Sequence, residues 1–244
     1  MSEFVDIEIS GSLLEIRFNR PAQKNALSLE MYTAAAHALR RAGEESEINA
    51  VLLTGAAGHF SSGNDLRDFM KNPPTGQESP VFQFLLALRG CPVPVGAAVE
   101  GFAIGIGTTM LLHCDFAWAS PTAKFRMPFV PLGLVPEAGA SVILPAIGGH
   151  RLAAELLYFG DFFGPEKALE AGIINGIDAE VKTLGRERMT ALAALPSEAM
   201  QLTKKLLRKG EDQKVMAAMQ EEAAIFVSRL KSAEFMAAVA AFQK

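Results

Sequence analysis

Three glycine-rich segments hold the residues whose types and spacing could support chemistry. The first, residues 60–66, reads FSSGNDL and lies between a β-rich run and a predicted helix. Turn-forming residues at the start of a helix leave backbone N–H groups exposed, and the helix dipole favours an anion there. Taken alone, the segment is better explained as a strand-to-helix turn, with Ser62 or Asn64 as the cap and Asp65 in the first turn.

The second segment, residues 101–109, reads GFAIGIGTT and follows another β-rich run. It has a superficial likeness to a dinucleotide-binding fingerprint, but Met110 stands where the third glycine belongs, so that interpretation is weak. A strand, a tight turn and a helix remain, and the first free N–H groups of this helix lie near Gly105 to Gly107. The alternative is close helix packing that only glycine permits.

The third segment, residues 134–141, contains Pro136 and Glu137 and predicts the start of a helix. Glu137 then lies in the first turn, where a surface glutamate would complement the helix dipole. Its preceding neighbours from Phe129 to Val135 are mostly apolar, however. A carboxylate buried among them would have a raised pKa and could act as a base. Taken alone, the segment is better explained by the surface glutamate.

Composition excludes several classes of protein. Half of the 244 residues are hydrophobic, 20% are charged and the net charge is -4, which excludes a disordered chain and argues against a nucleic-acid partner. The two cysteines and four histidines show no metal-ligand spacing, so we predict no metal site. Residues 204–209 place four cations on one helical face, which is either a solvated surface or a site for phosphates or RNA.

The chain also lacks the marks of membrane insertion and export. Its longest apolar stretch, residues 104–112, is shorter than the roughly 20 residues of a membrane span. The first residues are acidic where a signal peptide would be basic, and the last three are not a peroxisomal address. We therefore expect no membrane association and a cytoplasmic location.

Hydrophobic periodicity predicts an α/β fold. Residues 4–9 and 13–18 form a hairpin pattern, and a helix follows from the cap Ser28 to about Arg41. Further buried strands are expected at 50–54, 93–99 and 114–119, and their alternation with helices indicates parallel pairing. After Gly164 the pattern is almost entirely helical, with amphipathic runs at 180–194, 197–209 and 212–229.

Four ordered segments carry a family resemblance. Residues 20–27 read RPAQKNAL, residues 60–66 FSSGNDL and residues 101–107 GFAIGIG, and a strand containing Cys114 and Asp115 follows. In this order they resemble the R-P-x-x-x-N-A-L, F-S-x-G-x-D-L and G-x-A-x-G-x-G motifs of the crotonase (enoyl-CoA hydratase/isomerase) superfamily. The resemblance covers nearly the whole chain.

The resemblance implies an α/β crotonase-like ββα superhelix core at residues 1–190. A helical C-terminal trimerisation region at residues 191–244 would pack on the core or on a neighbouring subunit, in a homotrimer or hexamer. It also implies that the backbone N–H groups of Asn64 and Ile106 form an oxyanion hole for a thioester oxygen. Fixed donors of this kind, shielded from water, are worth several kcal/mol each.

By the same resemblance, the ligand is an acyl-CoA thioester, with coenzyme A as part of the substrate and no separate cofactor. Its phosphates would meet Lys24, Lys244 or the 204–209 face. Apolar residues at 82–88 either wall the acyl channel or belong to the core. The residues that the resemblance places around the ligand are Lys24, Ala26, Ser62, Gly63, Asn64, Asp65, Leu66 and Gly105.

The number of carboxylates selects the reaction. Family hydratases hold water between two glutamates, and at the corresponding positions this chain has Thr109 and Phe129. Glu137 instead matches the single glutamate of the peroxisomal-type Δ3,Δ2-enoyl-CoA isomerases. One carboxylate can move a proton between two carbons, so the expected reaction converts 3-enoyl-CoA to 2-trans-enoyl-CoA in fatty-acid β-oxidation. The alternatives are an enoyl-CoA hydratase, a thioester hydrolase or a non-catalytic relative that binds acyl-CoA or RNA.

Overall fold

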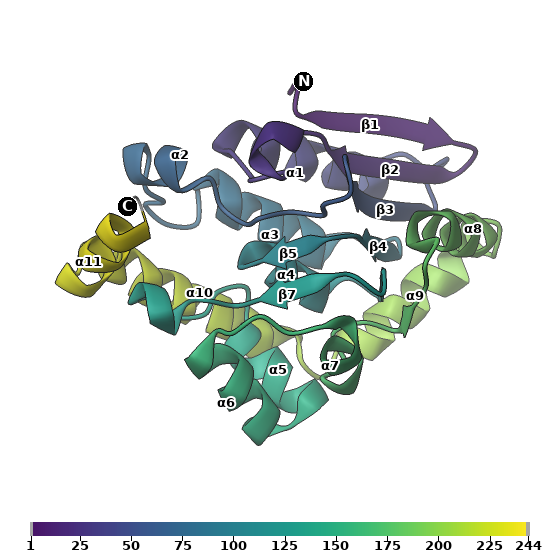
Figure 1. Cartoon of the computed structure of the whole chain (residues 1–244). Helices are drawn as coiled ribbons and strands as arrows, with labels where there is room; N and C mark the ends of the chain where they lie inside the picture. Colours follow the sequence, from purple (N-terminus) through teal and green to yellow (C-terminus); the bar gives the residue numbers. More distant parts are fainter. Residues whose placement is uncertain (1, 243–244) are drawn as a thin grey trace.

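The computed structural model describes residues 2–242, and a six-stranded sheet forms its centre (Figure 1). The strands β1 and β2 pair as an antiparallel hairpin, whereas all the other neighbours in this main sheet are parallel. Both features were expected from the alternating pattern and are confirmed. In spatial order the strands are β1 (Val5–Ser10), β2 (Leu13–Phe18), β3 (Ala50–Gly55), β4 (Val95–Val99), β6 (Phe116–Ala119) and β8 (Gly176–Ile177).

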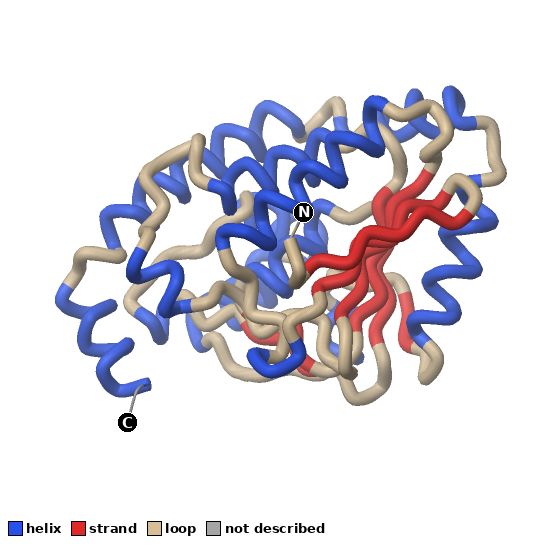
Figure 2. The backbone as a smooth tube through the Cα atoms, turned by 90° about the horizontal axis from the view of Figure 1, so that it is seen from above, coloured by secondary structure: helices blue, strands red, loops and turns tan. Residues whose placement is uncertain are grey.

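Helices cover both faces of the main sheet, which Figure 2 shows edge-on as red strands with blue helices on either side. Every residue of β3 and β4 is buried. A parallel strand covered on both faces reads as a continuous apolar run, and Val51, Leu52 and Leu53 follow that rule. Leu52 packs with Met189 of the helix at 181–193, while Leu53 belongs to the larger core on the opposite face.

A second, smaller layer lies next to the main sheet. It contains β5 (Phe102–Ile104) and β7 (Lys124–Arg126), which pair in parallel. Isolated bridges extend this layer from Ser61 to Ala103 and from Leu27 to Asn64. The chain therefore passes from a main-sheet strand into this layer and then into a helix several times, which is the ββα repeat that the resemblance implied.

The helices follow their expected positions closely. Ser28 caps the first one, its hydroxyl accepting the Met31 N–H at 3.3 Å, and the helix runs to Glu44 rather than Arg41. The α-helices are α1 (Leu29–Glu44), α2 (Leu66–Lys71), α3 (Pro80–Gly90), α4 (Ile106–Thr109), α5 (Ala140–Gly148), α6 (His150–Phe159), α7 (Pro165–Glu170), α8 (Val181–Ala193), α9 (Ser197–Arg208), α10 (Asp212–Arg229) and α11 (Ala233–Phe242), and the 3-10 helices are η1 (Pro21–Gln23), η2 (Met110–His113) and η3 (Val130–Leu132).

The C-terminal helices pack on the core of their own chain. The helix α10 contacts α5, and α11 contacts η3. Figure 1 shows α10 and α11 on one side of the molecule and α9 on the other. The division at residue 190 and the assembly into trimers or hexamers stay predictions. Along residues 2–242, no helix combines the length and the apolarity that crossing a bilayer requires.

The cationic face predicted at residues 204–209 is not a free basic surface. Lys204 is 7% exposed, and its ammonium donates to Asp115 Oδ2 and to the Val93 carbonyl, both at 2.7 Å. Arg208 donates to the other Asp115 oxygen at 3.0 Å. Burial lowers the pKa of Lys204, and Asp115 opposes that shift. The expectation of a phosphate or RNA site across this face is therefore wrong for two of its four cations, which neutralise the half-buried Asp115.

Replacing Lys204 by alanine should lower the free energy of unfolding by about 1–3 kcal/mol, because the Val93 carbonyl and one Asp115 oxygen lose their buried donor. Urea denaturation followed by circular dichroism measures the change. Lys205→Ala is the matched control, since Lys205 is its exposed neighbour, and it should stay within about 0.5 kcal/mol of the parent. Equal stabilities for the two variants would contradict the structural role of Lys204.

Candidate active site

Two of the glycine-rich turns lie against each other. Ser61 bridges Ala103, so residues 61–64 run beside β5. Gly63 has a φ of +92°, and a Cβ atom there would lie 2.7 Å from the Ile104 carbonyl oxygen. A side chain at Gly63 would thus be excluded twice, by conformation and by contact. The structure brings together the two segments from which the sequence predicts backbone donors.

The predicted donors are the N–H groups of Asn64 and Ile106. Ile106 is the first residue of α4, and the first N–H groups of a helix have no acceptor within the helix. Among residues 2–242, neither N–H donates to a protein acceptor. The Asn64 side chain is fixed separately, because its Oδ1 accepts the Tyr32 hydroxyl at 2.6 Å. Two amides without a protein acceptor therefore lie on adjoining turns, and Asn64 lines both cavities described below, whereas Ile106 is buried and lines neither. Their joint role as an oxyanion hole stays a prediction.

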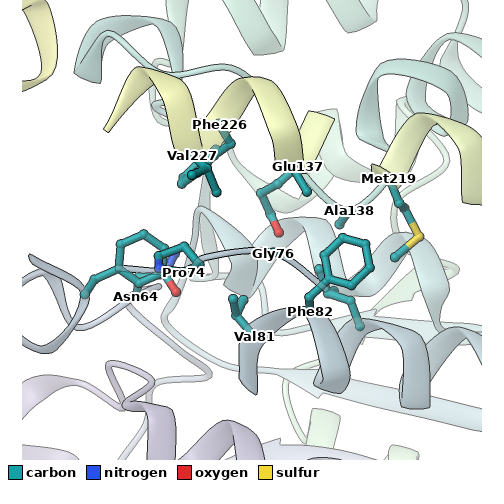
Figure 3. Close-up of a pocket in the computed structure, with 13 residues that line it drawn as sticks. Asn64, Pro74, Gly76, Val81, Phe82, Glu137, Ala138, Met219, Phe226 and Val227 are labelled. Atoms are coloured by element: carbon teal, nitrogen blue, oxygen red, sulfur yellow. The ribbon is translucent and has the colours of Figure 1, made fainter. Parts of the chain in front are cut away.

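Glu137 lies in a turn and not in a helix. The predicted start at Pro136 is wrong, because α5 begins only at Ala140. Ala138 and Gly139 adopt left-handed conformations with φ of +62° and +70°, and this interrupts the helical path before it can begin. The turn directs the Glu137 side chain into the space between Phe226 of α10 and Phe82 of α3 (Figure 3).

This space, the Glu137 cavity, has a volume of about 50 Å³ and is strongly apolar. Glu137 is the only acid among the described residues that line it. Phe82 and Leu85 also line it, whereas Phe84 and Leu88 are fully enclosed in the core. The choice between channel wall and core for residues 82–88 therefore differs from residue to residue. The walls of the Glu137 cavity are Phe69 of α2, Val81, Phe82 and Leu85 of α3, and Met219, Ala223, Phe226 and Val227 of α10, with Asn64, Pro74, Gly76 and Ala138 from the loops.

The environment of Glu137 makes it a strong base. Burial raises its pKa to about 8, a hydrogen bond from the Thr109 hydroxyl opposes the shift, and the charge of Glu222 adds to it. The carboxylate that results at higher pH is poorly solvated and has one hydroxyl donor. A group with these properties can take up a proton near neutral pH and release it again.

A larger cavity adjoins the first. This Lys24 cavity has a volume of about 490 Å³ and shares Asn64, Phe69 and Phe226 with the Glu137 cavity. No acid lines it within the described part of the chain, and Phe129, one of the two replaced glutamate positions, forms part of its wall. Of the residues predicted to surround the ligand, six line it: Lys24, Ser62, Gly63, Asn64, Leu66 and Gly105.

The other two predicted binding residues have structural contacts instead. Asp65 accepts a hydrogen bond from Arg20 at 2.6 Å and caps α2 through the N–H groups of Arg67 and Asp68. The Ala26 carbonyl also accepts from Arg20, at 3.2 Å. Both residues lie outside the cavity lining, and Arg20 ties them together. Lys244, proposed for a phosphate, lies outside the described residues.

Several lining residues were not foreseen from the sequence. Arg126 of β7 lines the Lys24 cavity, and its guanidinium lies 4.9 Å from the centre of the Phe162 ring. Lys24 lies similarly over Phe102, at 4.7 Å. Arg126 gave no signal in the sequence, because a lone arginine in a short strand is common. No group of three or more His, Cys, Asp or Glu side chains within residues 2–242 is arranged to hold a metal ion.

Two sheet layers in ββα repeats, with a buried carboxylate in an apolar cavity, define a protein of the crotonase type. The chain belongs to the enoyl-CoA hydratase/isomerase family, whose sequence profile matches residues 8–244. It is 36% identical over 250 residues to enoyl-CoA delta isomerase 2 of Homo sapiens, covering 98% of this chain and 63% of that protein.

With two other relatives, the match extends over nearly the whole length of both chains. A probable enoyl-CoA hydratase of Rhodobacter capsulatus is 34% identical, covering 96% of this chain and 93% of that protein. The solved structure of Pseudomonas aeruginosa OdaA is 40% identical, with a TM-score of 0.95 and 99% coverage of both chains. These relatives establish the family and the fold, whereas the human and Rhodobacter capsulatus proteins are named for different reactions.

Replacing Glu137 by glutamine should make the protein more stable than the parent, and this difference should grow as pH rises. The folded chain holds the Glu137 proton up to a pKa of about 8, whereas the unfolded chain releases it near the ordinary 4.5. Stability is therefore lost progressively between these values, and glutamine escapes the loss. At pH 8 we expect a gain of roughly 4 kcal/mol in the free energy of unfolding relative to the difference at pH 4.

Urea titrations at several pH values measure this difference between parent and variant. The exposed Glu187 of α8 provides the control, and Glu187→Gln should leave the pH dependence as it is. A Glu137→Gln curve parallel to that of the parent would show that the Glu137 carboxyl is not held protonated by the fold.

Proposed function

We propose that this protein is a Δ3,Δ2-enoyl-CoA isomerase that shuttles one proton through Glu137. The supporting observation is that Glu137 is the only acid among the described residues that line either cavity. The positions that would carry the two hydratase glutamates hold Thr109, which donates to Glu137, and Phe129, which is apolar. Water has no pair of carboxylates to hold and activate it.

The proposed reaction begins with the ionised Glu137 carboxylate removing a proton from C2 of a 3-enoyl thioester. The electrons of the C–H bond move into a dienolate whose charge rests on the thioester oxygen, facing the N–H groups of Asn64 and Ile106. Protonated Glu137 then returns the proton to C4, and the double bond moves into conjugation with the carbonyl. No atom is gained or lost, and the carboxylate is regenerated.

The surroundings of Glu137 suit this cycle. An ordinary carboxylate is far too weak a base for a proton next to a thioester, and burial brings the pKa of Glu137 to about 8. The apolar Glu137 cavity would take the hydrocarbon tail, while Lys24 and Arg126 in the larger cavity would meet the phosphates of coenzyme A. Coenzyme A is part of the substrate, and the proposed reaction needs no other cofactor. We also propose that the protein assembles as a homotrimer or hexamer.

Incubation with 3-hexenoyl-CoA and 2-hexenoyl-CoA, in separate reactions, tests the assignment. Isomerisation yields a conjugated product of unchanged mass from the first substrate. A hydratase would add the mass of one water to the second, a thioester hydrolase would release free thiol, and a non-catalytic relative would leave both unchanged. Any of these three outcomes without isomerisation would overturn the proposal.

Glu137→Gln should lower the isomerase kcat by about 10²–10⁴-fold, because glutamine cannot accept the C2 proton. The Kd for the acyl-CoA should change by no more than roughly threefold, since glutamine keeps the size of the side chain. Stopped-flow absorbance and calorimetry measure the two quantities, with Glu187→Gln as the control. A variant that turns over at the parent rate would exclude Glu137 as the shuttle.

In the parent protein, kcat/KM should rise with pH and level off above the Glu137 pKa of about 8, because only the ionised form takes the proton. Rate measurements from pH 5 to 9.5 test this shape. A flat profile, or one that falls across this range, would be incompatible with Glu137 as the initial base.

A further inference from the structure

A second buried carboxylate belongs to Glu222 of α10. Glu222 is 6% exposed and lies on the stripe of α10 that faces the core, together with Val215, Met219 and Phe226. None of the ion pairs formed by the described residues includes Glu222. A carboxylate buried without a cation is costly, and such a group is retained only with strong hydrogen bonds.

Its hydrogen bonds go to the turn that carries Glu137. Glu222 Oε2 accepts the Gly139 N–H at 2.6 Å, and Oε1 accepts the Ser141 N–H at 2.9 Å. These amides lie at the start of α5, where N–H groups lack acceptors within the helix and the dipole favours an anion. Both oxygens of one carboxylate thus hold the backbone just after Glu137.

The turn needs such support. Ala138 is left-handed at φ +62°, a conformation that costs a residue with a side chain on the order of 1–3 kcal/mol. The Ala138 carbonyl is held from the other side by His113, whose Nε2 lies 2.7 Å away. Burial lowers the pKa of His113 to about 3, so its ring is neutral and donates through Nε2. The hydrogen bonds to His113 and Glu222 therefore stabilise the left-handed conformation of the turn.

We propose that Glu222 is a positioning residue for Glu137: its carboxylate clamps the Gly139 and Ser141 amides and so fixes the direction in which Glu137 faces the cavity. The inference rests on the proposed function of Glu137. It also gives the C-terminal helix α10 a part in the site, beyond the apolar wall formed by Met219 and Phe226.

Glu222 also acts through its charge. It adds to the rise in the pKa of Glu137, after burial itself. The other polar groups facing this pair are Tyr32 of α1, Thr109 of α4, His113 of η2 and, beside Glu222 on its own helix, Glu221. None of them carries a positive charge at neutral pH, so loss of the Glu222 charge should lower the pKa of Glu137.

The test compares Glu222→Gln with Glu187→Gln, a control at an exposed position of α8. Glutamine keeps the shape but replaces one acceptor oxygen by an NH2 group that cannot accept an N–H. We expect kcat for 3-hexenoyl-CoA to fall about 10–100-fold with KM within about twofold, and the midpoint of the kcat pH profile to fall by half a unit or more. The control should match the parent. A folded Glu222→Gln enzyme with parental kcat and pH profile would overturn the inference.

Glu222→Asp covers the case in which the glutamine variant does not fold. It keeps both acceptor oxygens and the charge but shortens the side chain by one methylene, so kcat should fall while the pH midpoint stays near that of the parent. A parental kcat in this variant would likewise overturn the positioning role.

A readout without substrate separates this inference from the proposed function. In protein labelled with 13C at the glutamate carboxyl groups, the Glu137 signal is identified by its absence in Glu137→Gln. Its titration midpoint should be lower in Glu222→Gln than in the parent. If the parent does not isomerise 3-hexenoyl-CoA but this midpoint moves, the function is wrong and the contact stands. If the parent is active and neither kcat nor the midpoint changes, the inference alone fails.

Discussion

The energetic constraint at the centre of this structure is the burial of the Glu137 carboxyl in an apolar cavity. Its surroundings are mostly apolar, so among residues 2–242 only the Thr109 hydroxyl donates a hydrogen bond to the charged form, and a second carboxylate lies nearby. The fold tolerates this cost because the turn that carries Glu137 is held at several points. Such a cost is characteristic of functional sites, where chemistry takes precedence over stability.

The second requirement is the close contact of two turns that are distant in sequence. Each ββα unit leaves the main sheet at the end of a strand and places its next segment in the smaller layer, so residues 61–64 and 102–104 become neighbours. Glycine at position 63 allows the backbones to touch, and the first N–H of α4 remains free because a helix cannot use it. The donors are thus a product of topology and not of particular side chains.

Much of this could be predicted from the sequence. The hairpin, the buried parallel strands and the Ser28 cap follow from local patterns, and the ordered glycine motifs identified the family. The start of α5 could not be predicted, because a left-handed Ala138 has no local signature and is imposed by contacts from His113 and Glu222. The burial and pairing of Lys204 could not be predicted either, because its partner Asp115 is distant in the chain.

Glu222 is different, because the sequence did contain a signal. Val215, Met219, Glu222 and Phe226 are spaced by four, three and four residues, so an acid interrupts an otherwise apolar helical stripe. An ionisable residue at such a position requires buried partners, although the sequence does not say which ones. The structure identifies them as the backbone of the Glu137 turn.

The contact between Glu222 and the Glu137 turn joins distant parts of the chain, and this affects the order in which the protein folds during synthesis. The segments that carry Asn64, Ile106 and Glu137 are complete by residue 141, yet the carboxylate that holds the Glu137 turn belongs to a helix that starts at Asp212. A chain emerging from the ribosome would therefore fold most of its central sheet long before the Glu137 turn acquired its support. The same helix supplies Met219 and Phe226 to the Glu137 cavity, so the support of the turn and this wall of the cavity would form together.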